Sequence, residues 1–354
     1  NMKIALILPL NVWAAPYASI YTYILNKLKI NYDIIYWNRD LSEPNKDLSW
    51  NHAQKNNRLS RFTDYYAFSK FIKHRLTTEK YDKIILFNSV LPIYMQSFLE
   101  RRYKKKYIID IRDLSMEQFP LFKNSFKKAI SNSAINIVSS PGFIEHLPKA
   151  DYVISHNFDI EKVRTAINSN KEYYLPKKPI NILTIGQIRN YEANIEIADS
   201  LKDDNRFQLS FVGGGEVQER ISIHAIHNDI TNISFSDRYD KRIELNLIED
   251  ASFVNIFMPY IKSHNTLMSN RFYNALLIKK PLIATEGSIQ GELVKKHNLG
   301  IVISNGENLG EKLINFLDTL NMSEFSERCN NLLKQYAIEY DYFENKLIQF
   351  ISEK

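Results

Sequence analysis

Short apolar runs alternate with amphipathic stretches along the whole chain, and this alternation restricts the possible folds more than any other feature. The runs are apolar nearly throughout, instead of at every second position. That is the pattern of strands covered on both faces by helices. Because parallel strands need a crossover connection, such strands alternate with helices in a doubly wound sheet. The sequence therefore predicts an α/β protein with parallel sheets.

The alternation falls into two series. In the first, strands are predicted at 3–8, 33–37, 83–87, 106–111, 135–138 and 152–155, and helices at 17–29, 62–76, 91–102 and 122–131. In the second, strands are predicted at 180–185, 207–212, 232–235, 253–257, 281–284 and 300–303, and helices at 191–201, 217–228, 242–249, 270–278, 289–297, 308–320 and from 324 onward.

Two polar segments interrupt the alternation. Segment 168–179 contains two prolines and little apolar content, and is predicted to link two domains. We therefore expect a first domain over 1–170 and a second over 171–335. Segment 38–61 lacks periodicity and is long for a compact domain, so it is predicted to be a functional or mobile loop.

The composition is compatible with two globular cores. Apolar residues make up 44% of the 354 residues. Cys329 is the single cysteine, so no disulfide framework or thiolate cluster can form, which suits a reducing cytoplasm. No apolar run approaches the roughly 18 residues that span a bilayer. Residues 2–19 have the outline of a secretory signal, but 4–8 fits a buried first strand better.

Charge is distributed unevenly between the two halves. The formal net charge is +6, and residues 1–175 hold 26 Lys and Arg against 16 Asp and Glu. A basic half indicates an anionic partner, which can be nucleic acid, a membrane surface or a phosphorylated acceptor. No nucleic-acid partner is expected, because the basic residues are not interleaved with exposed aromatic residues in a reader motif.

The densest basic cluster lies at 101–106, and 119–130 places Phe side chains on one helical face with lysines beside it. Two interpretations are open. Such a helix can dock on anionic lipid headgroups, or it can pack its Phe face on the sheet and leave the lysines in water.

The stretch 267–285, which reads LMSNRFYNALLIKKPLIAT, carries the strongest local signals. Ser269 and Asn270 are good helix N-cap residues. An apolar face follows, and 279–281 ends the helix with two lysines at its negative end. The first turn of such a helix offers free N–H groups to a phosphate. Arg271 can add a charge-assisted hydrogen bond.

This stretch resembles the donor-site segment of GT-B glycosyltransferases of the family-4 type, in particular the branch that builds bacterial capsule and lipopolysaccharide O-antigen chains. The turn Gly186-Gln187-Ile188-Arg189 resembles the turn that opens the donor domain of that family. It implies that Gly186 and Arg189 approach a diphosphate. The segment 110–114, DIRDL, resembles a further motif of the family.

The resemblance implies two Rossmann-like domains facing across a cleft, with a nucleotide-sugar donor on the second and the acceptor on the first. It also implies that 336–354 crosses back to the first domain as a helix. A UDP-sugar is the expected donor, because UDP is frequent in the family, and the acceptor is a polyprenyl-diphosphate-linked or oligosaccharide chain. No cofactor is expected, and the enzyme is placed in the cytoplasm at the anionic inner face of the plasma membrane. No metal site is expected either, because His156 and His264 lack partners at ligand spacing.

The family carries two glutamates eight positions apart in this stretch, and the chain lacks both. Thr266 and Asn274 occupy those positions here. Asn274 still offers its amide to a ribose hydroxyl, while Thr266, Ser269 and Asn270 offer hydroxyl, amide and backbone groups to sugar or phosphate. Two alternatives stay open. The missing carboxylates favour a non-catalytic partner subunit with this fold. The other is a nucleotide-sugar epimerase of the same fold, although such enzymes rely on more acidic and His residues across the cleft than this chain offers.

Asp110, Arg112 and Asp113 follow a predicted strand of the first series. Charged groups at such a place are costly unless they pair or act chemically. Asp110 or Asp113 is a candidate general base on an acceptor hydroxyl if the reaction inverts. If the reaction retains, Arg112 is a candidate for steadying the donor phosphate or sugar. The alternative is a structural Asp–Arg pair that holds the loop.

Overall fold

The computed structural model describes residues 2–353 apart from 55–56, 170, 172 and 175–177. The chain separates into two compact units. Unit 1 comprises the residues up to Asn157 together with those from Glu339, and unit 2 comprises Phe158–Ile338. The predicted linker 168–179 and the boundary predicted at 170/171 include residues outside the described part. Among the described helices, none is both long enough and apolar enough to cross a membrane.

Unit 1 is built on a seven-stranded parallel sheet with strand order β3-β2-β1-β4-β5-β6-β7. Ile4 of β1 lies opposite Tyr32 of β2 and Lys83 of β4. Strands β4 and β5 are buried at every position, as expected for a sheet covered on both faces. The strands are β1 (Lys3–Leu8), β2 (Asn31–Asn38), β3 (Ser49–Asn51), β4 (Lys83–Phe87), β5 (Tyr107–Ile111), β6 (Ile135–Val138) and β7 (Val153–Ile154).

The helices of unit 1 include the C-terminal part of the long last helix, α13 (Met322–Ser352). The Phe343 ring of α13 packs edge-on against Tyr21, with ring centroids 5.4 Å apart. Lys83 Nζ donates a hydrogen bond to the Glu353 carbonyl oxygen at 2.5 Å. The remaining helices are α1 (Ala18–Lys27), α2 (Arg58–Thr78), α3 (Val90–Arg102) and α4 (Pro120–Asn132), with 3₁₀ turns η1 (Val12–Ala14), η2 (Met116–Gln118) and η3 (Pro141–His146).

Unit 2 contains a six-stranded parallel sheet with strand order β10-β9-β8-β11-β12-β13. Its core is centred on Phe207, Phe211 and Phe253, each at most 1% exposed. The strands are β8 (Ile180–Ile185), β9 (Phe207–Val212), β10 (Ile233–Ser236), β11 (Phe253–Asn255), β12 (Leu282–Thr285) and β13 (Gly300–Ile303).

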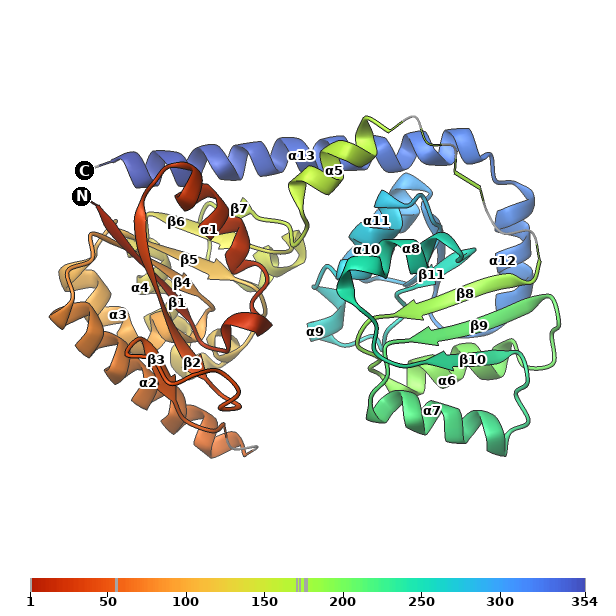
Figure 1. Ribbon diagram of the computed structural model, residues 1–354, viewed down its shortest axis with the longest axis horizontal. Helices are drawn as coiled ribbons and strands as arrows, with labels where there is room; N and C mark the ends of the chain where they lie inside the picture. Colours follow the sequence, from red (N-terminus) through yellow and green to blue (C-terminus); the bar gives the residue numbers. More distant parts are fainter. Residues whose placement is uncertain (1, 55–56, 170, 172, 175–177, 354) are drawn as a thin grey trace. The chain divides into compact units, whose positions relative to one another are not determined.

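The helices of unit 2 cover both faces of this sheet. Helices α6 and α7 lie together on one face, and α8 and α10 lie together on the other (Figure 1). The helices are α5 (Ile160–Ile167), α6 (Tyr191–Ser200), α7 (Glu216–His227), α8 (Glu244–Glu249), α9 (Lys262–Asn265), α10 (Asn270–Leu277), α11 (Ile289–His297) and α12 (Leu309–Asp318), with a 3₁₀ turn η4 (Lys241–Ile243).

Each sheet has a point at which its strand order reverses. This point lies between β1 and β4 in unit 1 and between β8 and β11 in unit 2. Ligands of doubly wound sheets bind beyond the carboxyl ends of the strands at such points. The predicted turn at Gly186 directly follows β8. The DIRDL segment, 110–114, covers the last two residues of β5 and the turn after them. The fold therefore places both predicted motifs at strand ends near a reversal point.

The α/β prediction is confirmed, and two local predictions are corrected. Segment 38–61 is not structureless, because β3 forms within it and α2 begins at Arg58. The Trp50 ring of β3 packs against Trp37 of β2 at a centroid distance of 4.9 Å. Helix α5 was not predicted. Its length of 8 residues is too short for periodicity to identify against a polar background.

The two lysines after α10 lie at the C-terminal end of the helix. The helix ends at Leu277, as the sequence signal predicts. Lys279 and Lys280 are buried, at 1% and 2% exposed. Lys279 Nζ donates to the Leu276 carbonyl oxygen at 3.2 Å, and Lys280 Nζ donates to that of Tyr174 at 3.1 Å. Burial lowers the pKa of each lysine to about 8.

Candidate functional site

The first turn of α10 is held in place by its N-cap residue. Ser269 Oγ accepts a hydrogen bond from the Phe272 N–H at 3.4 Å, which caps the helix as predicted. The Ser269 N–H and hydroxyl both donate to Gln290 Oε1 of α11, at 2.9 and 2.7 Å. Asn270 is the first residue of the helix. The helix N-terminus, with its partial positive charge, is therefore fixed against the neighbouring helix.

Arg271 lies one residue into this helix. Its Nη1 donates to the carbonyl oxygen of Asn255, the last residue of β11, at 3.1 Å. Burial lowers the pKa of Arg271 to about 10, with Tyr239 and Glu244 opposing this shift and Arg189 adding to it. The residue as a whole keeps some exposed surface. Among the described residues Arg271 has no ion-pair partner. A guanidinium that is enclosed by protein, yet reachable and unneutralised, favours an anionic ligand.

Glu244 of α8 places a carboxylate beside Asn274, the position at which the family carries a glutamate and this chain does not. Asn274 Nδ2 donates to Glu244 Oε1 at 2.6 Å. Tyr239 Oη and Lys241 Nζ both bond to the other oxygen, Oε2. Glu244 is only 4% exposed. The Asn274 side chain is therefore fixed by its amide nitrogen, and its Oδ1 makes no hydrogen bond within the described part of the chain.

Sequence reasoning missed Glu244, Tyr239 and Lys241. Glu244 lies thirty positions before Asn274, and no local pattern links the two. A usable signal was the placement of Glu244 in the first turn of the helix that connects β10 with β11, a strand at the reversal point of the same sheet. Carboxyl ends of neighbouring strands meet at one edge, so residues just after them are candidates for a shared site.

The turn after β8 depends on two glycines. Gly186 has a φ of +94°, which favours glycine. A Cβ on Gly213, in the next turn, would lie 1.9 Å from the Gly186 carbonyl oxygen, so the two turns can pack only without a side chain there. Arg189 follows in the same turn, is exposed, and bonds Gln187 through Nη2. Gly186 therefore shapes the turn that presents Arg189.

Thr266 lies apart from solvent. It is 4% exposed, and its hydroxyl donates to the Lys262 carbonyl oxygen at 2.9 Å, across α9. The Thr266 hydroxyl was predicted to bind sugar or phosphate, but its proton is used in this bond to the backbone. Asn274 bonds Glu244, and the charges of Glu244 and Arg189 both act on Arg271. Thr266 instead stabilises the segment that precedes α10.

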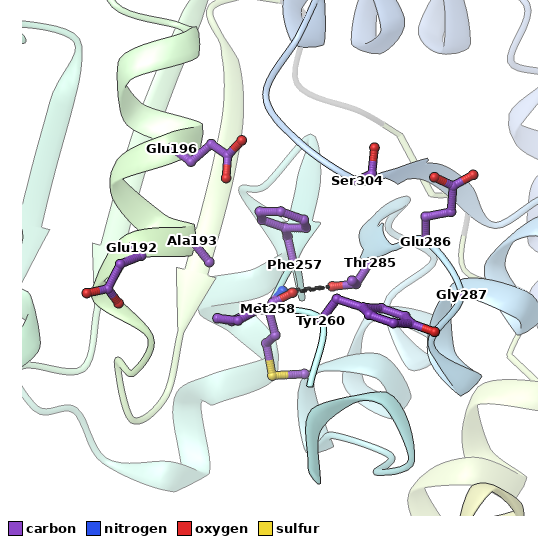
Figure 2. Close-up of a pocket in the computed structure, with 11 residues that line it drawn as sticks. Glu192, Ala193, Glu196, Phe257, Met258, Tyr260, Thr285, Glu286, Gly287 and Ser304 are labelled. Carbon is purple, nitrogen blue, oxygen red and sulfur yellow. Dashed lines mark hydrogen bonds between the residues drawn. The ribbon is translucent and has the colours of Figure 1, made fainter. Parts of the chain in front are cut away.

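A separate cavity of about 540 Å³ lies in the same unit. Figure 2 shows Glu196 of α6 on one side, Tyr260 on another, and Phe257 and Thr285 between them. Thr285 Oγ1 accepts from the Met258 N–H and donates to the Met258 carbonyl oxygen, both at 2.8 Å. None of the predicted site residues lines this cavity.

In unit 1, the DIRDL segment forms a buried pair. Asp110 is fully buried, and its Oδ2 accepts from Arg112 Nη2 at 2.6 Å and from Tyr21 Oη. Arg112 Nη1 donates to the Ser155 carbonyl oxygen at 3.1 Å, and the guanidinium lies 4.9 Å from the centre of the Tyr17 ring. Burial acts to lower the Arg112 pKa, but Asp110 together with Tyr21 and Tyr17 outweighs it, so the pKa is raised.

This geometry distinguishes the three predicted residues. Asp110 has no exposed surface, so its carboxylate cannot reach an acceptor hydroxyl and serves to hold Arg112. Asp113 is exposed and is the one carboxylate of the segment that a ligand can approach. The catalytic role of Asp113 and the ligand contact of Arg112 stay predictions. In the described residues no group of three or more His, Cys, Asp or Glu side chains is arranged to hold a metal ion.

Comparison with known proteins identifies the fold. No protein-family model and no curated sequence matches the chain. Among solved structures, the sucrose-phosphate synthase of Thermosynechococcus elongatus is similar over 99% of this chain and 100% of that one, at 15% identity and a TM-score of 0.70. The chain has the GT-B fold. The predicted fold class is thereby confirmed.

Other solved structures agree. The lipopolysaccharide outer core galactosyltransferase WaaB matches over 95% of this chain and 99% of its own, at 14% identity and a TM-score of 0.65. Anabaena HepE, solved in complex with UDP, matches over 94% and 95%, at 14% identity and a TM-score of 0.60. At these identities the likeness establishes the fold, and the reaction has to be argued from the site.

Proposed function

We propose that this protein is a glycosyltransferase that moves a sugar from a nucleotide-diphosphate sugar, a UDP-sugar, to a lipid-linked or oligosaccharide acceptor in bacterial surface polysaccharide synthesis. The observation that carries the proposal is Arg271. It is enclosed at the first turn of α10, has no ion-pair partner among the described residues, and feels the charge of Arg189. Two arginines whose charges act on each other, and whose guanidinium groups bind no carboxylate of the described residues, fit a diphosphate.

The chemistry follows from this charge. In the transfer, the bond between the sugar C1 and the diphosphate oxygen breaks, and the acceptor oxygen forms the new bond to C1. Negative charge grows on the departing diphosphate. Arg271, Arg189 and the N–H groups of the first turn of α10 at Asn270 would stabilise that charge without a metal ion. Asp113 would take the acceptor proton if the configuration at C1 inverts.

The ribose of the donor has a partner in the Asn274–Glu244 pair. Asn274 Oδ1 is an acceptor, and its orientation is fixed by the bond from Nδ2 to Glu244. A ribose hydroxyl donates readily to such an oxygen. Glu244 thus contributes to ribose binding by setting the direction of the Asn274 amide.

The acceptor side of the proposal is supported by the surface of unit 1. On α4, Phe126 and Ile130 are buried, so most of the Phe-bearing face packs on the sheet. Leu121, however, is 82% exposed and Phe119 is 43% exposed at the start of the helix. Exposed lysines follow at 123, 127 and 128. Exposed apolar side chains beside lysines fit anionic lipid headgroups, and hence a peripheral location at the inner face of the plasma membrane with a polyprenyl-diphosphate-linked acceptor.

The first experiment is calorimetric titration of the full chain with UDP, GDP, CMP and ADP. We expect UDP to bind with micromolar affinity, and Arg271→Ala and Asn274→Ala to weaken it strongly. Arg206→Ala is the matched control, because this arginine of the same unit is neutralised by Asp204 and Glu311. If none of the nucleotides binds, the donor site is refuted and the non-catalytic partner subunit becomes the leading interpretation.

A second assay separates transfer from epimerisation. The full chain is incubated with a panel of UDP-sugars and an extract of bacterial lipid-linked saccharides, and products are resolved by mass spectrometry and NMR. Release of UDP together with an elongated acceptor supports transfer. Conversion of the UDP-sugar into an isomer of equal mass, with no UDP released, supports the epimerase instead.

A further inference from the structure

The cavity between α6 and the turns after β11, β12 and β13 differs in charge from the Arg271 site. Three of its lining residues are carboxylates, Glu192, Glu196 and Glu286, and its described lining includes no Lys or Arg. An adjoining groove adds Asp199 and Glu307 and likewise has no cationic lining residue in the described chain. The local field is therefore negative, and a phosphate or carboxylate ligand would be repelled.

An exposed aromatic ring forms another side of this cavity. Tyr260 is 67% exposed, although it is a large side chain. Its ring lies close to Gly287, since a Cβ there would lie 3.0 Å from the Tyr260 ring atom Cε2. Phe257 and Met258 give the cavity an apolar wall (Figure 2). The cavity thus combines hydrogen-bond acceptors, an open ring and an apolar surface.

Hydrogen bonds hold two parts of the cavity wall. Met258 is pinned to Thr285 by a reciprocal pair of hydrogen bonds at 2.8 Å. Glu196 Oε1 accepts from the Gly306 N–H at 2.9 Å, and this bond fixes its carboxylate while Oε2 stays available. A site that is ordered before its ligand arrives loses less entropy on binding.

The cavity is also connected to the proposed donor site through one segment. Asn255, whose carbonyl oxygen accepts from Arg271, ends β11, and Phe257 follows two residues later. The same short segment therefore supports the Arg271 guanidinium and forms a wall of the cavity. A ligand in the cavity and a diphosphate at Arg271 would be positioned by one piece of backbone.

We propose that this cavity binds an uncharged saccharide unit of the acceptor or donor, and that it selects against sugars carrying a phosphate or a uronic acid group. This rests on the proposed function, because the glycosyltransferase assignment supplies the saccharide. Sugar hydroxyls donate to the Glu196 and Glu192 carboxylates, and the C–H face of the sugar ring packs on Tyr260. A volume of about 540 Å³ accommodates such a unit.

The test uses saturation-transfer NMR on the full chain with methyl glycosides of glucose, galactose, mannose and N-acetylglucosamine, and with methyl glucuronide as the charged counterpart. Methyl glucosaminide, a cationic sugar, completes the set. We expect at least one neutral glycoside to bind and the glucuronide not to bind. Tyr260→Ala and Glu196→Gln should each weaken binding at least about tenfold, while Tyr23→Ala, an exposed tyrosine of unit 1, serves as control.

Calorimetry with UDP on the same variants separates this inference from the function on which it rests. We expect Tyr260→Ala and Glu196→Gln to bind UDP like the parent, and Arg271→Ala to retain glycoside binding. Binding of UDP with no neutral glycoside bound overturns the saccharide cavity and leaves the donor site intact. Binding of the glucosaminide alone also overturns it, because the cavity would then be a cation site. Equal binding of glucuronide overturns the charge selection.

Discussion

Arg112 in unit 1 and Arg271 in unit 2 are both enclosed arginines near the carboxyl ends of parallel strands, yet their surroundings are opposite. Arg112 bonds a fully buried carboxylate, Asp110, at 2.6 Å, and its pKa is raised. Arg271 bonds a backbone carbonyl and has no carboxylate partner within the described chain, and its pKa is lowered to about 10. A buried charge that has an ion-pair partner stabilises the fold, whereas one without a partner favours the binding of a ligand of opposite charge.

The same contrast extends to two lysines. Lys279 and Lys280 are buried next to carbonyl oxygens and have no ion-pair partner among the described residues. Unlike Arg271, they are almost without exposed surface, so no ligand can reach them. Enclosure without neutralisation is therefore not sufficient for a binding site, because the charge must also be accessible.

The largest effect is expected from Asp110→Asn. It leaves Arg112 buried without its counterion and should lower the unfolding free energy of unit 1 by about 3–5 kcal/mol. All three tryptophans, Trp13, Trp37 and Trp50, belong to unit 1, so tryptophan fluorescence during urea unfolding reports on this unit. Glu79→Gln removes an exposed partner of Lys3 in the same unit and should change stability by no more than about 1 kcal/mol. Equal effects would contradict the structural role of the buried pair.

Arg271→Ala should separate binding from stability. We expect UDP affinity to fall about ten- to hundredfold, since a charge-assisted hydrogen bond contributes about 1.5–3 kcal/mol. Stability should stay equal or rise, because a desolvated and unpaired charge is removed. Calorimetry and circular dichroism on one preparation measure both. Destabilisation like that of Asp110→Asn would show that Arg271 is structural.

Arg189→Ala should have a smaller and more salt-dependent effect. Arg189 is exposed, so its attraction to a diphosphate is screened by mobile ions. UDP affinity should fall about tenfold at low salt, and much less at 0.5 M NaCl, where the screening length shortens to about 4 Å. Titrations at two salt concentrations test this. A loss independent of salt would mean that Arg189 makes a dry contact like the one expected of Arg271.

The smallest effect concerns Lys279 and pH. Its pKa is lowered to about 8 by burial, against an ordinary 10.5, so the folded state binds fewer protons than the unfolded one between these values. The resulting destabilisation is fully present below about pH 8 and disappears as pH rises toward 10.5. Lys279→Met should therefore stabilise unit 2 by about 1 kcal/mol at pH 7. It should also flatten the rise in stability between pH 8 and 10.5.

Hydrogen exchange of β12 peptides, read by mass spectrometry, measures this in unit 2. Lys295→Met serves as control, because that lysine lies exposed near the end of α11. If Lys279→Met lowers protection at pH 7, the buried ammonium contributes to stability through its bond to Leu276, and the interpretation as an unneutralised charge fails.

Several elements followed from local pattern alone. The strands at Lys3–Leu8, Ile180–Ile185 and Phe207–Val212 have the predicted bounds, because short, largely apolar segments bounded by turn residues favour strands. The Ser269 cap of α10 was also predicted correctly, since capping depends on residues that are three positions apart. Such features need no knowledge of the rest of the chain.

The sequence by itself determined the α/β class, the positions of most strands and the placement of Arg271 at a helix start. Only the tertiary structure decided that Glu244 would hold Asn274, that Asp110 would neutralise Arg112, and that Arg271 would have no ion-pair partner among the described residues. The physical reason is that a charged side chain is neutralised by groups that lie near it in the folded structure, which need not be near it in the sequence. Whether a side chain is structural or available to a ligand depends on groups that the fold brings together from distant strands.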